Sequence, residues 1–115
     1  MRASTLGIMF VKAVSSNAQF PHDKMGKTTV AQGDFLFVGL NALAPGQEHA
    51  SHVHQGQDKL YFILEGTGVV QIGEQTETLC AGDAAYAPSG AFHSIHNPGP
   101  GRLVAMVVLA PPPKS

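Results

Sequence analysis

Histidines are the side chains of this sequence with the clearest chemical use. Five of the six fall between positions 49 and 96, and His52 and His54 are spaced i, i+2. On a strand such residues share one face, about 6.6 Å apart along the backbone, so both imidazoles can reach one metal ion at about 2.1 Å. A third ligand must come from a neighbouring strand. We predict that His93, which follows a Pro-x-Gly turn, supplies it.

Neutral imidazoles suit Fe, Mn, Zn, Ni or Cu rather than calcium or magnesium, so the expected cofactor is a divalent transition metal of open identity. His49 lies off the parity of the ligand pair and is expected at the surface or behind the ligands. His96 has the same status, and His22 lies in a loop. Glu48 and Gln47 could orient an imidazole through its second nitrogen.

Short apolar segments separated by turn residues must position these histidines. Thirteen glycines and eight prolines punctuate the chain at intervals of about ten residues, and long amphipathic helices are absent. This pattern predicts an all-β sandwich or barrel with a tight hairpin at Gly73–Glu74. The expected strands are Ile8–Val14, Lys27–Ala31, Phe35–Leu43, Leu60–Glu65, Gly68–Ile72, Gln75–Cys80, Ala84–Ala87, Phe92–Asn97 and Arg102–Leu109.

Several strands are apolar on both faces. The segments "FLFVGL", "LYFIL" and "LVAMVVLA" have no polar side, so each face must lie against something. A second sheet would cover one face, and either the N-terminal strands or a second copy of the chain would cover the other. We expect a homodimer.

Composition indicates the number of domains, the partners and the location of the protein. With 115 residues, 43% of them hydrophobic and 13% charged, the chain is expected to form one domain over residues 1–115, with "PPPKS" at 111–115 as a loose tail. The net charge is −1 and the seven Lys and Arg residues are scattered, so neither nucleic acid nor membrane is an expected partner. The single cysteine, Cys80, is expected to be a small buried residue, and the N-terminus has no signal-peptide pattern, which favours a cytoplasmic location.

Two motifs enclose the candidate ligands. The first spans residues 46–66 with Gly46, His52, His54 and Gly66; the second spans 82–97 with Gly82, Pro88, Gly90, His93 and Asn97. At these spacings the chain resembles the cupin superfamily. The resemblance implies a small double-stranded β-helix, a jelly-roll barrel, whose mouth holds a metal ion on His52, His54 and His93.

One residue departs from the cupin pattern. The family's first motif places a glutamate ligand where this chain has Lys59, and strand parity puts Lys59 on one face with Tyr61 and Ile63. A β-bulge could instead turn Asp58 or Gln57 inward. An ammonium has no lone pair, and at about 5 Å from a divalent ion with an effective dielectric near 20 it is repelled by roughly 6 kcal/mol.

Three arrangements would tolerate the lysine. Lys59 could swing aside onto Glu48, Glu77 or another acid; it could hold an anionic substrate that bridges it to the metal; or the barrel could be metal-free, with Lys59 as the ligand anchor. Burial would also lower the pKa of Lys59, so general-base or imine chemistry is conceivable.

For function, we therefore expect a metal-dependent enzyme acting on a small anionic organic substrate, of dioxygenase, isomerase, lyase or decarboxylase type. Lys59 and Tyr61 are the expected substrate-binding residues, and the catalytic residues stay unassigned. The alternative is a non-catalytic module that binds a small ligand or a metal.

Overall fold

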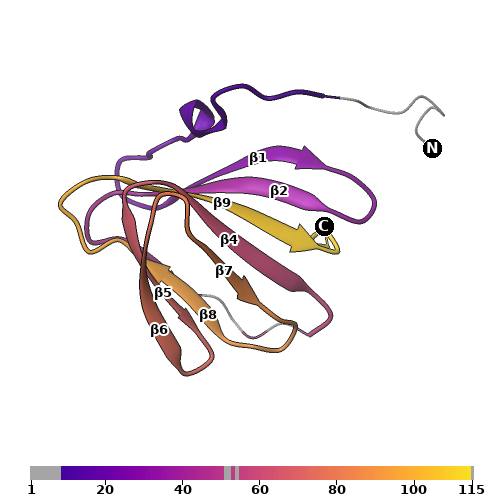
Figure 1. Ribbon diagram of the computed structural model, residues 1–115. Coiled ribbons are helices and arrows are strands. Elements are labelled where there is room, and N and C mark those ends of the chain that lie inside the picture. Colours follow the sequence, from indigo (N-terminus) through magenta and orange to yellow (C-terminus); the bar gives the residue numbers. More distant parts are fainter. Residues whose placement is uncertain (1–8, 51–52, 54, 115) are drawn as a thin grey trace.

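The computed structural model describes residues 9–50, 53 and 55–114 (Figure 1). Within these residues the chain forms one short 3-10 helix, η1 (Val14–Asn17), and nine strands. The strands are β1 (Gly26–Gln32), β2 (Phe37–Leu43), β3 (Glu48–Ala50), β4 (Asp58–Glu65), β5 (Thr67–Ile72), β6 (Gln75–Cys80), β7 (Ala84–Ala87), β8 (His93–His96) and β9 (Leu103–Ala110).

The strands form two sheets that face each other. One has the order β1-β2-β9-β4-β7 and the other the order β3-β8-β5-β6, and neighbouring strands are antiparallel throughout (Figure 1). This is the double-stranded β-helix, so the expected all-β jelly-roll barrel is confirmed. No helix formed by the described residues is long and apolar enough to cross a membrane.

The core lies between the sheets and follows from the two-residue period of the strands. Tyr61 and Ile63 of β4 face inward beside Val107 and Ala105 of β9, and Val70 pairs with Ile95 in the opposite sheet. All of these residues are buried. Leu43 and Leu103 complete the cluster.

The N-terminal segment covers part of the outer face of the five-stranded sheet (Figure 1). By register, Leu40 and Val104 point away from the core, yet they are 1% and 0% exposed. Phe20 lies under the guanidinium of Arg102, 4.4 Å from ring centroid to Cζ. A Cβ at Gly26 would run into the carbonyl of Gln19. The residues that precede β1 therefore bury the apolar outer face of β2 and β9 around Leu40 and Val104.

The strand predictions are confirmed along most of the chain. The two-residue hairpin turn at Gly73–Glu74 joins β5 and β6, with Ile72 paired to Gln75. The prediction of a strand at Ile8–Val14 is wrong over its described part, since residues 9–13 form no strand and η1 starts at Val14. Polar residues explain the turn, because Asn17 Nδ2 donates to the carbonyl of Val14 and so competes with strand pairing.

One further strand was missed, and one smaller expectation fails. The three-residue strand β3 was not predicted, because "EHA" carries no apolar alternation. Cys80 is exposed rather than buried, since it ends β6, an edge strand with five exposed residues out of six.

Residues of the two motifs hold the loops at the ends of the strands. Gly66 has φ +85°, and a Cβ there would run into the carbonyl of Arg102. Asn97, 1% exposed, donates from Nδ2 to the carbonyls of Leu43 (2.8 Å) and Gly101 (2.9 Å). Its Oδ1 accepts from the amide of Gly99 at 2.8 Å. Asn97 therefore links the ends of β2, β8 and β9.

Candidate functional site

His93 opens β8 with its ring buried at 8% exposure. Its Nδ1 lies 3.2 Å from the carbonyl oxygen of Ala91, which can only accept, so this contact assigns the proton to Nδ1 and the lone pair to Nε2. A ring nitrogen that donates to a carbonyl is the usual way in which a metal-binding imidazole is oriented. His52 and His54 lie outside the described residues, so their convergence with His93 stays a prediction.

Lys59 faces into the barrel from β4, as strand parity predicted, and is 7% exposed. Its Nζ lies 4.7 Å from the centroid of the Tyr61 ring, a cation–π contact. Burial, and secondly the charge of Lys27, lowers the pKa of Lys59 to about 8. No carboxylate of the described residues forms an ion pair with it. A lysine swung aside onto Glu48 or Glu77 is therefore excluded.

The alternative of a bulge at the start of β4 is wrong as well. Asp58 is exposed, and its Oδ1 accepts a hydrogen bond from the amide of Ser89 at 2.9 Å. Gln57 donates from Nε2 to the carbonyl of Pro111 at 2.9 Å. The irregularity in β4 lies at its other end, between Ile63 and Glu65. Neither Asp58 nor Gln57 replaces the missing glutamate.

Tyr61 joins Lys59 and His93 into one cluster. Its ring meets that of His93 edge to face, with centroids 6.1 Å apart and an interplanar angle of 65°. Tyr61 is fully buried, and its hydroxyl has no hydrogen-bond partner among the described residues. Burial raises the pKa of the phenol, so the hydroxyl keeps its proton. Tyr61 is therefore a core residue whose hydroxyl has no hydrogen-bond partner among the described residues.

His49 lies near Lys59 and His93, although its strand parity predicted a position at the surface or behind the metal ligands. It lies on β3 opposite the buried Ile95, and its Nδ1 is buried without a hydrogen-bond partner among the described residues. Burial lowers its pKa to about 4, and the charges of Lys59 and Lys27 act in the same direction, as would a second proton on the His93 ring. His49 is therefore a neutral imidazole.

The neighbours of His49 that were expected to orient an imidazole lie elsewhere. Gln47 Oε1 accepts from the amide of Ala44 at 2.8 Å, which closes a turn, and the Glu48 side chain is exposed.

A cavity of about 300 Å³ lies between β1, β2, β9 and β4 of one sheet and β3 of the other. Lys59 and His49 line it, whereas Tyr61 and His93 are not among its lining residues. Its charged lining residues are Lys27 and Lys59, and no Asp or Glu is among the described residues that line it. Asn41, 4% exposed, lines it too, and Asn41 Nδ2 has no hydrogen-bond partner among the described residues. The cavity is therefore cationic and rich in unused donors. Lys27 and Asn41 were not predicted, because only the pairing of β1 with β2 reveals them.

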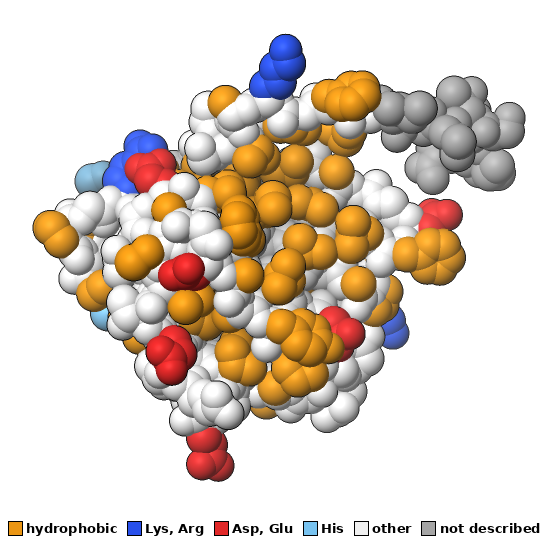
Figure 2. Space-filling view, viewed as in Figure 1, with side chains coloured by type: hydrophobic (Ala, Val, Ile, Leu, Met, Phe, Trp, Pro, Cys, Tyr) orange, Lys and Arg blue, Asp and Glu red, His pale blue; other side chains and the backbone are white. Residues whose placement is uncertain are grey.

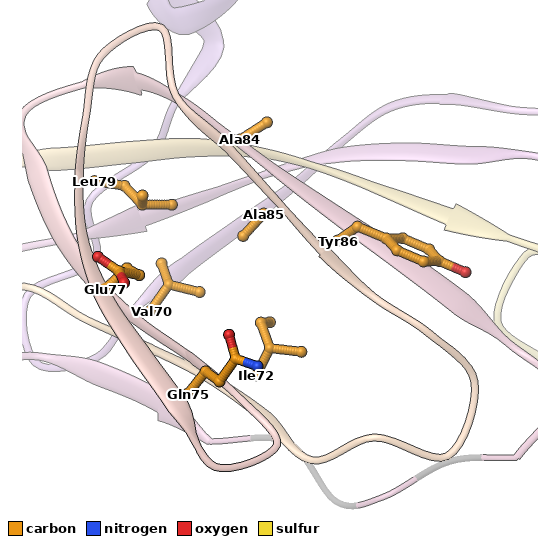
Figure 3. A pocket seen from close by; sticks show the side chains of 8 residues that line it. All are labelled: Val70, Ile72, Gln75, Glu77, Leu79, Ala84, Ala85 and Tyr86. Atoms are coloured by element: carbon orange, nitrogen blue, oxygen red, sulfur yellow. The ribbon is translucent and has the colours of Figure 1, made fainter.

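A second cavity of about 300 Å³ opens between β6 and β7. Figure 3 shows Val70, Ile72 and Leu79 directed toward Ala85, while Tyr86 points away. Its one charged lining residue is Glu77. This cavity offers apolar contact but no group of reactive side chains, so the candidate site is the cationic cavity.

The topology defines a double-stranded β-helix protein, and comparison with known proteins identifies its family. Residues 39–109 match the model of the cupin domain. The chain belongs to the cupin family.

Three proteins that are similar to this chain illustrate its relationships within and beyond its own length. TT1209 from Thermus thermophilus is 41% identical, with a TM-score of 0.86 over 91% of this chain and 100% of that chain. The oxalate-binding protein of Thermotoga maritima is 36% identical over 74 residues, which are 64% of this chain and 60% of that protein. A 5-nitrosalicylic acid 1,2-dioxygenase of Bradyrhizobium is 34% identical over 59 residues, 51% of this chain and 28% of that enzyme. The chain thus spans less than two thirds of these last two relatives.

Proposed function

We propose that the barrel binds a small organic anion at Lys59, beside a divalent transition metal held by His52, His54 and His93. The observation that carries the proposal is the burial of Lys59 at 7% exposure with no paired carboxylate among the described residues. A buried charge without a counter-charge destabilises a fold, so such charges are usually paired or bound to a ligand. An anionic ligand would supply the missing counter-charge.

Among the described residues, the orientation of His93 fits a metal site, whereas the charge of Lys59 opposes one. His93 is oriented as a metal-binding imidazole is, by its contact with the Ala91 carbonyl. No group of three or more His, Cys, Asp or Glu residues that could hold a metal occurs within the described part of the chain. The charge of Lys59 would repel a bare ion. An anion lying between Lys59 and the metal removes this conflict, which supports binding both together.

When bound, such an ion would supply Lewis acidity or a site for dioxygen chemistry. The chain's own residues would do the rest. Lys59 would bind and orient the carboxylate through charge-assisted hydrogen bonds. His49, a neutral imidazole, could accept or donate one further hydrogen bond, and Phe37 and Leu109 would keep water from the reacting end.

An enzyme acting on a small carboxylic acid, of dioxygenase, isomerase, lyase or decarboxylase type, is the function that we favour. Two of the relatives are named for small acids, oxalate and 5-nitrosalicylic acid. The second candidate is a metal-free barrel that binds an organic anion without turnover. It is favoured by the same Lys59, which stands where the family pattern has a metal ligand.

Metal analysis and one charge reversal separate these candidates. Metal content should fall in His93→Ala and stay unchanged in His22→Ala, which alters an exposed loop histidine. Lys59→Glu should raise metal affinity, because it restores a carboxylate ligand, and should weaken binding of carboxylic acids such as butyrate. Both effects are measured by elemental analysis and calorimetric titration, with Lys59→Met as the neutral control.

Two outcomes would contradict the proposal. Equal and negligible transition metal in wild type and His93→Ala would remove the metal and leave the anion-binding barrel. Unchanged butyrate affinity in Lys59→Met would remove Lys59 as the anchor.

A further inference from the structure

The cationic cavity has polar groups at two separate ends. Lys59 pairs with Leu109, which pairs with Phe37 on β2, and this row marks one end. Asn41 on β2 pairs with Lys27 on β1 and marks the other. Phe37 and Asn41 are four residues apart on one strand, about 13 Å in an extended backbone. The side chains of Lys59 and Lys27 therefore start well apart and reach into one space.

Asn41 is the strongest sign that the second end binds a ligand. It is 4% exposed and lines the cavity, and its Nδ2 has no hydrogen-bond partner among the described residues. A buried donor without an acceptor destabilises the fold, so such atoms usually have partners. The main-chain pairing of β2 with β1 and β9 leaves the side-chain amide of Asn41 for an acceptor in the cavity.

Lys27 adds a positive charge at the same end. It lines the cavity from the edge strand β1 and is exposed at its rim. Lys27, Lys59 and His49 line the same cavity, and the charge of Lys27 accordingly lowers the pKa of both other side chains. With no Asp or Glu among the described lining residues, the two lysines repel each other across the cavity.

The wall between the two ends is apolar on β2 and β9. Val107 pairs there with Gly39, which has no side chain to fill the space, and Leu109 and Phe37 lie beside them. On β1, Thr29 pairs with Gly39 and also lines the cavity. A Cβ at Gly39 would lie 2.8 Å from the Phe37 ring. A ligand with a hydrocarbon segment between two acidic groups therefore matches the lining better than one that is polar throughout.

We propose that the bound anion is a small dicarboxylate with a short apolar chain, one carboxylate on Lys59 and the other on Asn41 and Lys27. This inference rests on the proposed anion site at Lys59. The cavity volume of about 300 Å³ is at the lower end of ligand sites, which span about 300–1,000 Å³. It therefore suits a short chain.

Matched pairs of acids test the second carboxylate. Succinate, glutarate and adipate are each titrated calorimetrically against the monoacid that lacks one carboxylate: propionate, butyrate and pentanoate. We expect at least one diacid to bind wild type about tenfold or more tightly than its monoacid, because charged hydrogen bonds form at the second end. In Lys27→Met and Asn41→Leu this gain should shrink several-fold while monoacid affinity stays unchanged. Lys24→Met, an exposed lysine outside the cavity, is the control.

The results separate this inference from the proposed function. If monoacids bind and depend on Lys59, but no diacid binds more tightly, the anion site stands and the dicarboxylate is wrong. If Lys27→Met and Asn41→Leu weaken mono- and diacids equally, there is no second carboxylate site. If no acid binds wild type, both proposals fall.

Discussion

Lys59 sets the sign of the charge at the mouth of this barrel. A glutamate at this position would face the same cavity with a negative charge and lone pairs for a metal. The lysine instead faces it with an ammonium that lies over the Tyr61 ring and has no carboxylate partner among the described residues. At this position the chain therefore has a buried cation where the family pattern has a carboxylate.

Burial of Lys59 should make stability depend on pH. In the fold its pKa is lowered to about 8, against an ordinary value of 10.5. Below pH 8 both folded and unfolded chains carry the proton, and the fold bears the cost of the buried charge. From pH 8 to 10.5 the unfolded chain binds more protons, so stability rises with pH, by an amount of the order of 3 kcal/mol.

Lys59→Met removes this titration. We expect the variant to unfold at higher denaturant than wild type at pH 7, and the difference to shrink as pH rises from 8 to 10.5. Urea unfolding across this range measures it, with Lys24→Met as the control for an exposed lysine. The other titratable groups around Lys59, namely Lys27, His49, His93 and Tyr61, are present in all three proteins. Parallel pH profiles for wild type and Lys59→Met would show that Lys59 is not buried as a cation.

At the scale of elements, Asn97 connects the loops that end three strands. Its side chain makes three hydrogen bonds, to the main chain of Leu43, Gly101 and Gly99, and is 1% exposed. The amide of Gly46 also donates to the Asn97 carbonyl at 2.8 Å, which ties the first motif to the second. The motif asparagine therefore acts on the fold rather than on a ligand.

Truncation at Asn97 should be costly. Asn97→Ala leaves the buried carbonyl of Leu43 without its donor, and we expect a loss of about 2–4 kcal/mol in the free energy of unfolding. Asn17→Ala, which removes an exposed hydrogen bond, should cost under about 0.5 kcal/mol. Chemical denaturation measures both. A loss below about 1 kcal/mol at Asn97 would mean that the loops hold without it.

The elements that the sequence predicted best are those with two-residue alternation or motif glycines. Parity alone placed Lys59 inward, and the spacing around Gly73 predicted the hairpin. The sequence did not predict that Asn41, Lys27 and His49 line one cavity, because this depends on the register of β1 on β2 and of β3 on β8. Local residue patterns do not determine the register between strands that are distant in sequence. The same limit explains the wrong strand before η1, where apolar residues lacked a pairing partner.

For the whole molecule, one half-buried apolar face remains. By register Leu60, Phe62, Met106 and Val108 point outward from the middle of the five-stranded sheet, where Figure 2 shows hydrophobic side chains gathered. The N-terminal segment buries the end of this face near Leu40 and leaves these four side chains partly exposed. An apolar patch of this kind is typical of a surface that binds a partner.

We therefore still expect a homodimer, with this face as its centre. Sedimentation at micromolar concentration should show a dimer for wild type and a monomer for Phe62→Glu, since burying a carboxylate in an apolar interface is unfavourable. Thr76→Glu adds the same charge to an exposed position on the other sheet and should leave the dimer intact. Circular dichroism confirms folding of both. A strictly monomeric wild type would contradict the expectation.

The residues that follow β9 offer a way to change the size of the cationic cavity without altering a strand. Residues 111–114 look dispensable in the sequence, yet Pro113 lines the cationic cavity and the Pro111 carbonyl fastens Gln57. Substitutions here leave the strand pairing alone and so carry little risk for folding. Pro113 is therefore the first position to vary when a larger cavity is wanted, and affinity tags should be placed away from this end.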